Sequence, residues 1–163
     1  MNDEPIHPAV RVGHVHLRVS DLDRSLAFYR DALGFGLVGD GRGVGFEGVF
    51  LAAGDYHHHV GLNTLESAGG TPPPPGHTGL YHVAFVYPDR RELGRAVRRL
   101  IDHDYPIDHG TDHGATVSVY LSDPDGNGVE LYYDRPRADW FDPDGHPLLK
   151  AERFDYRELL ANP

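Results

Sequence analysis

Hydrophobic and polar side chains alternate along the first strongly patterned stretch of the chain, residues 12–19 (VGHVHLRV). Val15, Leu17 and Val19 fall on one face, and the residues between them, including His14 and His16, fall on the other. A period of two residues is typical of a half-buried strand. We therefore expect the first strand here, with its histidines on the polar face.

The spacing then changes to that of a helix. Ser20 or Asp21 is a suitable N-cap, and the glycines at 34 and 36 end the segment. Between them the apolar residues recur on one helical face, at Leu22, Leu26, Tyr29 and Leu33. A strand followed by a helix is the expected start of the fold.

Short strands complete the first half of the chain. Glycine-rich residues 39–48 predict a turn with short strands, and residues 49–53 and 57–64 (HHHVGLNT) each predict a strand. The order is thus β-α-β-β-β. Residues 66–79 (ESAGGTPPPPGHTG) carry four consecutive prolines among small residues and are interpreted as a connector.

The pattern of the first half begins again after the connector. YHVAFVYPD mirrors GHVHLRVSD, and His82 stands in the second copy where His14 stands in the first. A second helix is expected on the stripe formed by Leu93, Val97, Leu100 and Ile101, followed by strands at 117–121 and 129–133. Neither half could bury its sheet alone, so the two are expected to pack together.

These patterns predict a single α+β domain, residues 1–163, of two tandem β-α-β-β-β modules. Module one covers about residues 10–65, module two about residues 80–135, and residues 136–163 form a tail. The tail carries Trp140 and a short predicted helix at about 155–160. We expect it to cover one end of the sheet.

The hairpin of module two contains a carboxylate on a sheet face. Residues 123–128 (DPDGNG) are turn formers, and in the strand after them Glu130 shares a face with Tyr132 while Val129 and Leu131 point the other way. A carboxylate on the inner face of a sheet is costly unless it is paired, protonated or bound to a metal. The remaining sequence has to supply its partner.

Composition narrows the classes of function. The chain has no cysteine, which excludes disulfides, thiolate nucleophiles and structural Cys-zinc sites. A net charge of −10 argues against nucleic acid as a partner. The sequence shows neither a targeting signal nor an apolar span, so a cytoplasmic protein without a membrane partner is expected. Twelve histidines beside a single lysine, Lys150, make histidine the unusual component.

A duplicated module that opens on His14 and on His82, with Glu130 after DPDGNG, resembles the vicinal oxygen chelate superfamily over about residues 12–135. That superfamily includes glyoxalase I, bleomycin-resistance proteins and type I extradiol dioxygenases. The run from Thr111 through Tyr120 to Glu130, followed by Trp140, is most similar to the catechol 2,3-dioxygenase-like branch. The resemblance implies an open, half-barrel mixed sheet around a central metal site.

The same resemblance implies that His14, His82 and Glu130 are the metal ligands. Two imidazoles and one carboxylate form the facial triad of non-haem Fe(II) oxygenases, which leaves positions for a catecholate and dioxygen. Fe(II) is the implied metal, with Mn(II), Ni(II) and Zn(II) as alternatives. The implied reactants are an aromatic diol and O2, and the implied role is the degradation of aromatic compounds. The resemblance leaves open whether the protein forms a homodimer.

Acid-base roles also follow from the resemblance. His113 and Tyr120 match the histidine and tyrosine that orient the substrate hydroxyl and the ketonised intermediate by hydrogen bonds. A further acid-base histidine is expected on the last strand of module one, where the best alignment gives His58. A slip of one residue would make it His57 or His59.

Plainer interpretations exist for each residue. His14 and His82, taken singly, are more often strand-face histidines, and the repeat is what favours ligation. His16 shares the face of His14, but Ala84 stands at its counterpart. The histidines at 57–59 also match a solvated edge, and Tyr120 also matches core packing. Other histidines lie in predicted loops and are interpreted as solvated: His7, His77, His103, His109 and His146.

Three rival functions remain. A glyoxalase-type isomerase or lyase shares the fold and uses zinc or nickel as a Lewis acid, but it takes a carboxylate from each module. The equal-offset position to Glu130 is Leu62, and HHHVGLNT holds no acidic residue. The second rival is a non-catalytic, bleomycin-resistance-like binding protein with an apolar groove. The third is a protein whose metal serves only stability.

Overall fold

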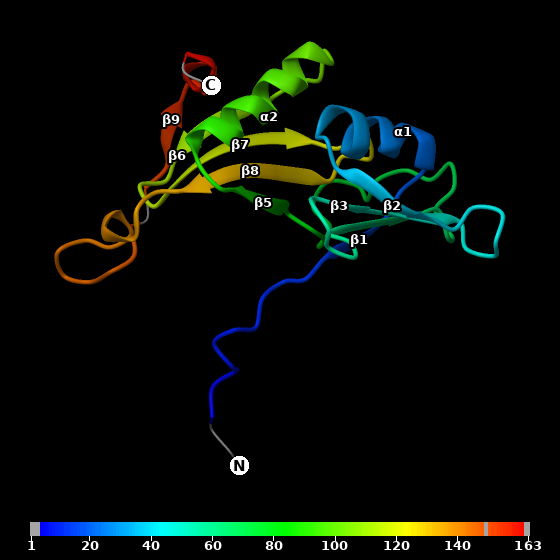
Figure 1. The fold of residues 1–163 in the computed structure, drawn as a ribbon, viewed down its shortest axis with the longest axis horizontal. Coiled ribbons are helices and arrows are strands. Elements are labelled where there is room, and N and C mark those ends of the chain that lie inside the picture. Colours follow the sequence, from blue (N-terminus) through cyan, green and yellow to red (C-terminus); the bar gives the residue numbers. More distant parts are fainter. Residues whose placement is uncertain (1–3, 149, 162–163) are drawn as a thin grey trace.

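The computed structural model describes residues 4–148 and 150–161 and places two similar modules side by side (Figure 1). The α+β class and the repeated modules predicted from the sequence are confirmed. Helices α1 and α2 lie on one side of the strands, and the N-terminal lead-in leaves from the other side. The elements of module one are β1 Val15–Arg18, α1 Leu22–Leu26, the π-helical turn η1 Ala27–Ala32, β2 Gly36–Asp40, β3 Gly48–Ala52 and β4 Val60–Asn63.

Module two repeats this order, and one further strand and two short 3-10 helices follow it. Its elements are β5 Val83–Tyr87, α2 Arg90–Asp102, β6 His109–Asp112, β7 Thr116–Ser122, β8 Gly128–Asp134, η2 Arg137–Asp139, β9 Glu152–Phe154 and η3 Tyr156–Leu160. The number of residues between equivalent positions of the two modules is the same for the first strand and for the helix. β5 starts as far after β1 as α2 starts after α1, and His82 follows His14 at that same separation.

The strands form two separate sheets, with orders β1-β4-β3-β2 and β5-β8-β7-β6-β9. In each sheet the first strand of the module runs parallel to the last long one, β1 to β4 and β5 to β8, and the other pairs are antiparallel. The open mixed-sheet architecture that was expected is present, and it consists of two sheets, one in each module. The two sheets are held together by packing and side-chain contacts.

Local sequence signals account for both helices. Asp21 accepts a hydrogen bond from the Arg24 amide at 2.8 Å, and Asp89 caps α2 through the Glu92 amide at 2.9 Å. The π-helical turn after α1 lets Phe28 and Tyr29 both enter the core, where they are 1% and 0% exposed. The structure thus selects Asp21 as the first N-cap.

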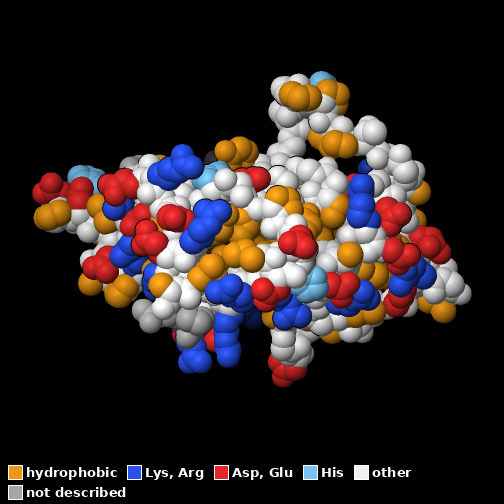
Figure 2. Space-filling view, turned by 90° about the horizontal axis from the view of Figure 1, so that it is seen from above, with side chains coloured by type: hydrophobic (Ala, Val, Ile, Leu, Met, Phe, Trp, Pro, Cys, Tyr) orange, Lys and Arg blue, Asp and Glu red, His pale blue; other side chains and the backbone are white. Residues whose placement is uncertain are grey.

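The hydrophobic core lies between the helices and the sheets. Leu17, Val49 and Leu62 from module one and Val119 and Leu131 from module two belong to one continuous buried cluster. On the helix-bearing side, acidic and basic side chains are interleaved around hydrophobic ones (Figure 2). Among the described residues, no helix is long and apolar enough to cross a membrane.

Several predicted bounds differ from the structure. The first strand begins at Val15 rather than residue 12, and β4 begins at Val60 rather than residue 57. Ile101 remains 37% exposed at the edge of the α2 stripe. The sequence patterns did not predict β6 or β9, which pair with each other and extend the second sheet with part of the tail.

Candidate active site

Strand pairing in module two places three predicted site residues next to one another. Tyr120 on β7 and Ala84 on β5 are the cross-strand partners of Glu130 on β8. Val129 and Leu131 are fully buried in the core, so Glu130 points to the opposite face. His82 directly precedes β5 and lies on the same face.

Glu130 uses both of its carboxylate oxygens. Oε2 lies 3.0 Å from His82 Nε2, and Oε1 accepts a hydrogen bond of 2.8 Å from the Tyr120 hydroxyl. The Glu130 side chain is 12% exposed and that of His82 is 31% exposed. Burial, with the hydrogen bond to Glu130 next, raises the pKa of Tyr120 to about 12, so this phenol keeps its proton at neutral pH.

His113 extends this contact chain. Its Nε2 lies 2.9 Å from the Tyr120 hydroxyl oxygen, and its Nδ1 lies 3.0 Å from the Lys150 carbonyl oxygen. A carbonyl can only accept, so Nδ1 carries a proton. The single hydroxyl proton of Tyr120 goes to Glu130, so both contacts of the tyrosine are satisfied together only when His113 Nε2 also carries a proton.

The histidines of module one form a second group. The His14 and His58 rings lie 4.4 Å apart between centroids, and His58 also lies 5.0 Å from Phe50. Burial, followed by the charges of His14 and its neighbours, lowers the pKa of His58. His59 instead accepts a hydrogen bond from the Ala53 amide at Nδ1 and lies near Phe35.

These groups lie in a segment that matches a known protein family. The family model described as the Glyoxalase/Bleomycin resistance protein/Dioxygenase superfamily matches residues 11–131. The chain belongs to this superfamily. The match covers both modules, and the resemblance inferred from the repeat and the Thr111–Glu130 run is confirmed.

Relatives within the superfamily include two ring-cleaving enzymes. The chain is 39% identical to a catechol-2,3-dioxygenase of Bacillus subtilis over 157 residues, which are 95% of this chain and 53% of that protein. It is 32% identical to biphenyl-2,3-diol 1,2-dioxygenase 3 of Rhodococcus globerulus over 124 residues, 76% of this chain and 63% of that protein. The chain therefore spans between half and two thirds of the length of these relatives.

A solved superfamily structure carries a different activity. The lactoylglutathione lyase of Agrobacterium tumefaciens aligns with a TM-score of 0.58 and 28% identity, over 78% of this chain and 96% of that one. The proteins that this chain resembles thus include a lactoylglutathione lyase as well as dioxygenases. The site residues have to distinguish between them.

Strand register identifies the module-one counterpart of Glu130. His16 pairs with Gly61 in β1 and β4, as Ala84 pairs with Glu130 in β5 and β8. The equivalent position is therefore Gly61, one residue before Leu62, the equal-offset position in the sequence. A β-carbon built on Gly61 would lie 2.8 Å from His16 Nδ1, so this position has no room for a side chain without a shift of the imidazole.

The three predicted ligands, His14, His82 and Glu130, do not converge on one point in the structure. Within residues 4–148 and 150–161, one group of His, Cys, Asp or Glu residues has three ligand atoms that all lie within 4.8 Å of one another. It consists of Asp142, Asp144 and His146 and lies in an exposed turn. His82 and Glu130 are paired, while His14 lies beside His58.

Two site contacts were not predicted from the sequence. His109, interpreted as a loop histidine, lies on β6 and stacks on Tyr120 with ring centroids 4.8 Å apart. The Lys150 carbonyl that holds His113 belongs to the tail. Neither has a sequence signal, because a backbone carbonyl carries no side-chain identity and β6 has a weak pattern, HGTD.

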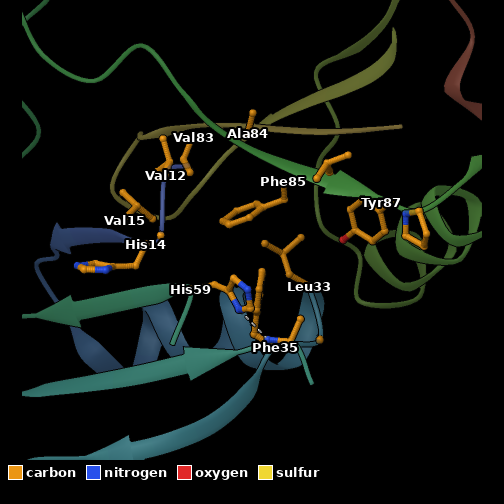
Figure 3. Close-up of a pocket in the computed structure, with 15 residues that line it drawn as sticks. Val12, His14, Val15, Leu33, Phe35, His59, Val83, Ala84, Phe85 and Tyr87 are labelled. Carbon is orange, nitrogen blue, oxygen red and sulfur yellow. Dashed lines mark hydrogen bonds between the residues drawn. The ribbon is translucent and has the colours of Figure 1, made fainter. Parts of the chain in front are cut away.

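A cavity of about 460 Å³ lies between the modules beside His14. Leu33, Phe35 and His59 from module one and Phe85 from module two point toward its centre (Figure 3). Apolar side chains make up most of the wall, and no Lys or Arg among the described residues lines it. Such a volume and lining are typical of a small-molecule site.

Proposed function

We propose that this protein is an extradiol-type dioxygenase that opens the ring of an aromatic 1,2-diol with O2. The observation that supports this most strongly is the Glu130 carboxylate, placed between His82 and Tyr120 with His113 next in line. The ring-cleaving relatives support the same reaction class. Because this chain spans only part of the length of these relatives, their activity is a proposal for this protein.

The donors of module two fit a metal ion. Two donors at right angles, each about 2.1 Å from one ion, are about 3 Å apart. His82 Nε2 and Glu130 Oε2 are 3.0 Å apart. We assign these two atoms and an imidazole nitrogen of His14 as the ligands, Fe(II) being favoured over Mn(II), Ni(II) or Zn(II). When bound, such an iron supplies the one-electron chemistry that dioxygen requires.

The surrounding side chains orient the ligand and handle protons. Tyr120 holds Glu130 Oε1, which leaves Oε2 for the metal. His113 Nε2 lies beside the Tyr120 hydroxyl oxygen, and the imidazole is assigned as the group that donates a proton to an oxygen of the substrate. His58, with its lowered pKa, is neutral near pH 7 and is assigned as the acceptor of a diol proton.

The cavity between the modules is assigned to the apolar part of the substrate. His14 lines it, so the cavity adjoins one of the assigned metal ligands, and its wall in module two includes Ala84, the strand partner of Glu130. Because its wall carries no Lys or Arg among the described residues, we expect uncharged ring substituents to be preferred over carboxylates.

The test is anaerobic reconstitution with Fe(II), followed by a panel of catechols with oxygen uptake and absorbance of the yellow ring-opened product as readouts. Glu130→Ala is expected to abolish metal retention. His113→Ala is expected to keep the metal and slow turnover by about 100-fold, the usual scale for loss of a general acid. Equal metal loss in both variants would overturn the division of roles.

A glyoxalase-type isomerase is the second candidate, because the Agrobacterium tumefaciens lyase shares the fold. Gly61 argues against it, since the counterpart of Glu130 in module one supplies no carboxylate. Isomerisation of a thiol adduct of a keto-aldehyde by the Ni(II)- or Zn(II)-loaded protein, without turnover of any diol, would favour the isomerase.

A further inference from the structure

The turn between β7 and β8 contacts module one through buried polar groups. Residues 123–127, here called the seam turn, were interpreted from sequence only as turn formers. The Asp123 carboxylate accepts a hydrogen bond of 2.9 Å from the hydroxyl of Tyr29 in η1. Asp123 is 4% exposed and Tyr29 is 0% exposed.

The Asp123 carboxylate also organises the seam turn itself. Its Oδ1 accepts from the amides of Asp125 and Asn127 at 2.9 and 2.8 Å, and its Oδ2 accepts from Asn127 Nδ2 at 2.9 Å. Four donors thus satisfy a nearly inaccessible carboxylate that has no ion-pair partner among the described contacts. One of the four, the Tyr29 hydroxyl, comes from module one.

A second carboxylate of the seam turn binds the end of β1. Asp125 Oδ1 accepts from the Ser20 hydroxyl and from Arg24 Nη2, both at 2.6 Å, and Oδ2 accepts from the Ser20 amide at 3.2 Å. Ser20 lies between β1 and the first helix. The seam turn is therefore attached to the strand that follows His14.

The seam turn links the strand that carries Glu130 to the part of module one that follows His14 in the chain. Glu130 is three residues beyond Asn127 along β8, about 10 Å, and His14 is six residues before Ser20 along β1, about 20 Å, at the rise of an extended chain. Within the described part of the chain, no strand hydrogen bonds join the two sheets. A small rotation at the seam turn would therefore displace His14 from Glu130 by a larger distance.

We propose that the seam turn is a positioning device, in which Asp123 and Asp125 fix the orientation of module two on module one and so set how His14 meets His82 and Glu130. The metal part of this inference rests on the proposed function. Tyr29, Asp123 and Asp125 are positioning residues that do not touch the assigned metal ligands in any described contact. An error of about 1 Å at a reacting centre can cost about 100-fold in rate.

The test combines two seam variants with a control. Tyr29→Phe removes the hydroxyl donor to Asp123, and Asp125→Asn keeps the acceptor for Ser20 but removes the charge opposite Arg24. The control is Leu159→Ala, which removes a fully buried side chain from η3, at the end of α2 far from the first helix (Figure 1). All three are expected to lower the urea midpoint and to leave the circular dichroism spectrum unchanged.

Orientation is measured by spin labels. The chain has no cysteine, so Val38→Cys on β2 and Arg98→Cys on α2, both exposed, provide one label in each module. We expect both seam variants to broaden the distance distribution and to weaken metal binding at least about tenfold, while Leu159→Ala does neither. An unchanged distribution in both seam variants, or equal broadening in the control, would overturn the proposal.

The two hypotheses fail separately. If the wild-type protein binds no divalent metal, the assigned metal centre is wrong, and the spin-label distances still decide whether the seam turn sets module orientation. If the wild-type protein binds metal and the seam variants bind it equally well with narrow distances, the positioning role is wrong and the metal centre stands.

Discussion

Removing the Tyr120 hydroxyl tests how far Glu130 depends on its hydrogen bond. In Tyr120→Phe the 2.8 Å bond to Oε1 is lost while the ring, the strand and the 3.0 Å contact with His82 stay. A hydrogen bond to a charged group contributes about 1.5–3 kcal/mol. At about 1.4 kcal/mol per factor of ten, complete loss would weaken metal binding by about 10- to 150-fold.

We expect the lower part of this range, about 10- to 30-fold, because the pairing of β8 with β5 and β7 still places Glu130 at the site. This agrees with the usual effect of removing a group that holds a metal ligand. The measurement is competitive titration of the metal-free protein with Fe(II) under anaerobic conditions, together with oxygen uptake at saturating metal. Tyr132→Phe, two residues from Glu130 on the same face of β8, is the matched control.

The pH profile separates orientation from proton transfer by the phenol. The pKa of Tyr120 is raised to about 12, so its hydroxyl stays protonated between about pH 6 and pH 9. Tyr120→Phe should therefore lower activity without moving either limb of the profile. Metal binding within twofold of the wild type, or an equal loss in Tyr132→Phe, would refute the assigned role of the hydroxyl.

Three further results are expected. Gly94→Ala should lower the thermal midpoint and speed proteolysis of the tail, although alanine usually favours a helix, because its β-carbon would lie 2.6 Å from the Leu159 carbonyl oxygen. The free energy of unfolding should decrease as pH falls below about 6.5, since the lowered pKa values of His16 and His58 let the unfolded chain bind their protons first; urea titrations of a variant with glutamine at both positions should show a smaller decrease. Phe85→Trp, at a side chain that points toward the cavity centre (Figure 3), should narrow the cavity and reduce kcat/KM for an aryl-substituted catechol at least about tenfold more than for catechol itself, and equal losses would show that the cavity does not hold the substituent.

Periodicity revealed the repeated modules because each buried face has a strict spacing. The offset between His14 and His82 is also the offset between the starts of their strands and helices. The face of Glu130 followed from the alternation of Val129 and Leu131 in the same way. Both features depend only on the local pattern of apolar residues, so they can be predicted from a single sequence.

Other features depend on contacts that no local pattern encodes. His58 would share the buried face of Val60 in a regular strand, but β4 starts only at residue 60 and His58 lies with Phe50 and His14 instead. Asp123 fits a turn former, and its bond to Tyr29 depends on how the modules pack. Gly61 replaced Leu62 as the counterpart of Glu130 because the loops of the two modules differ in length.

The hydrogen bond from His113 to the Lys150 carbonyl gives the tail a part in the proposed chemistry. The family match ends at residue 131, and β9 pairs with β6 well beyond that boundary. A version of the chain shortened to residue 135 would keep every assigned ligand and still lose the acceptor for His113 Nδ1. Its imidazole would then be free to rotate. The proposed catalytic unit thus extends to a backbone oxygen outside the segment that matches the family.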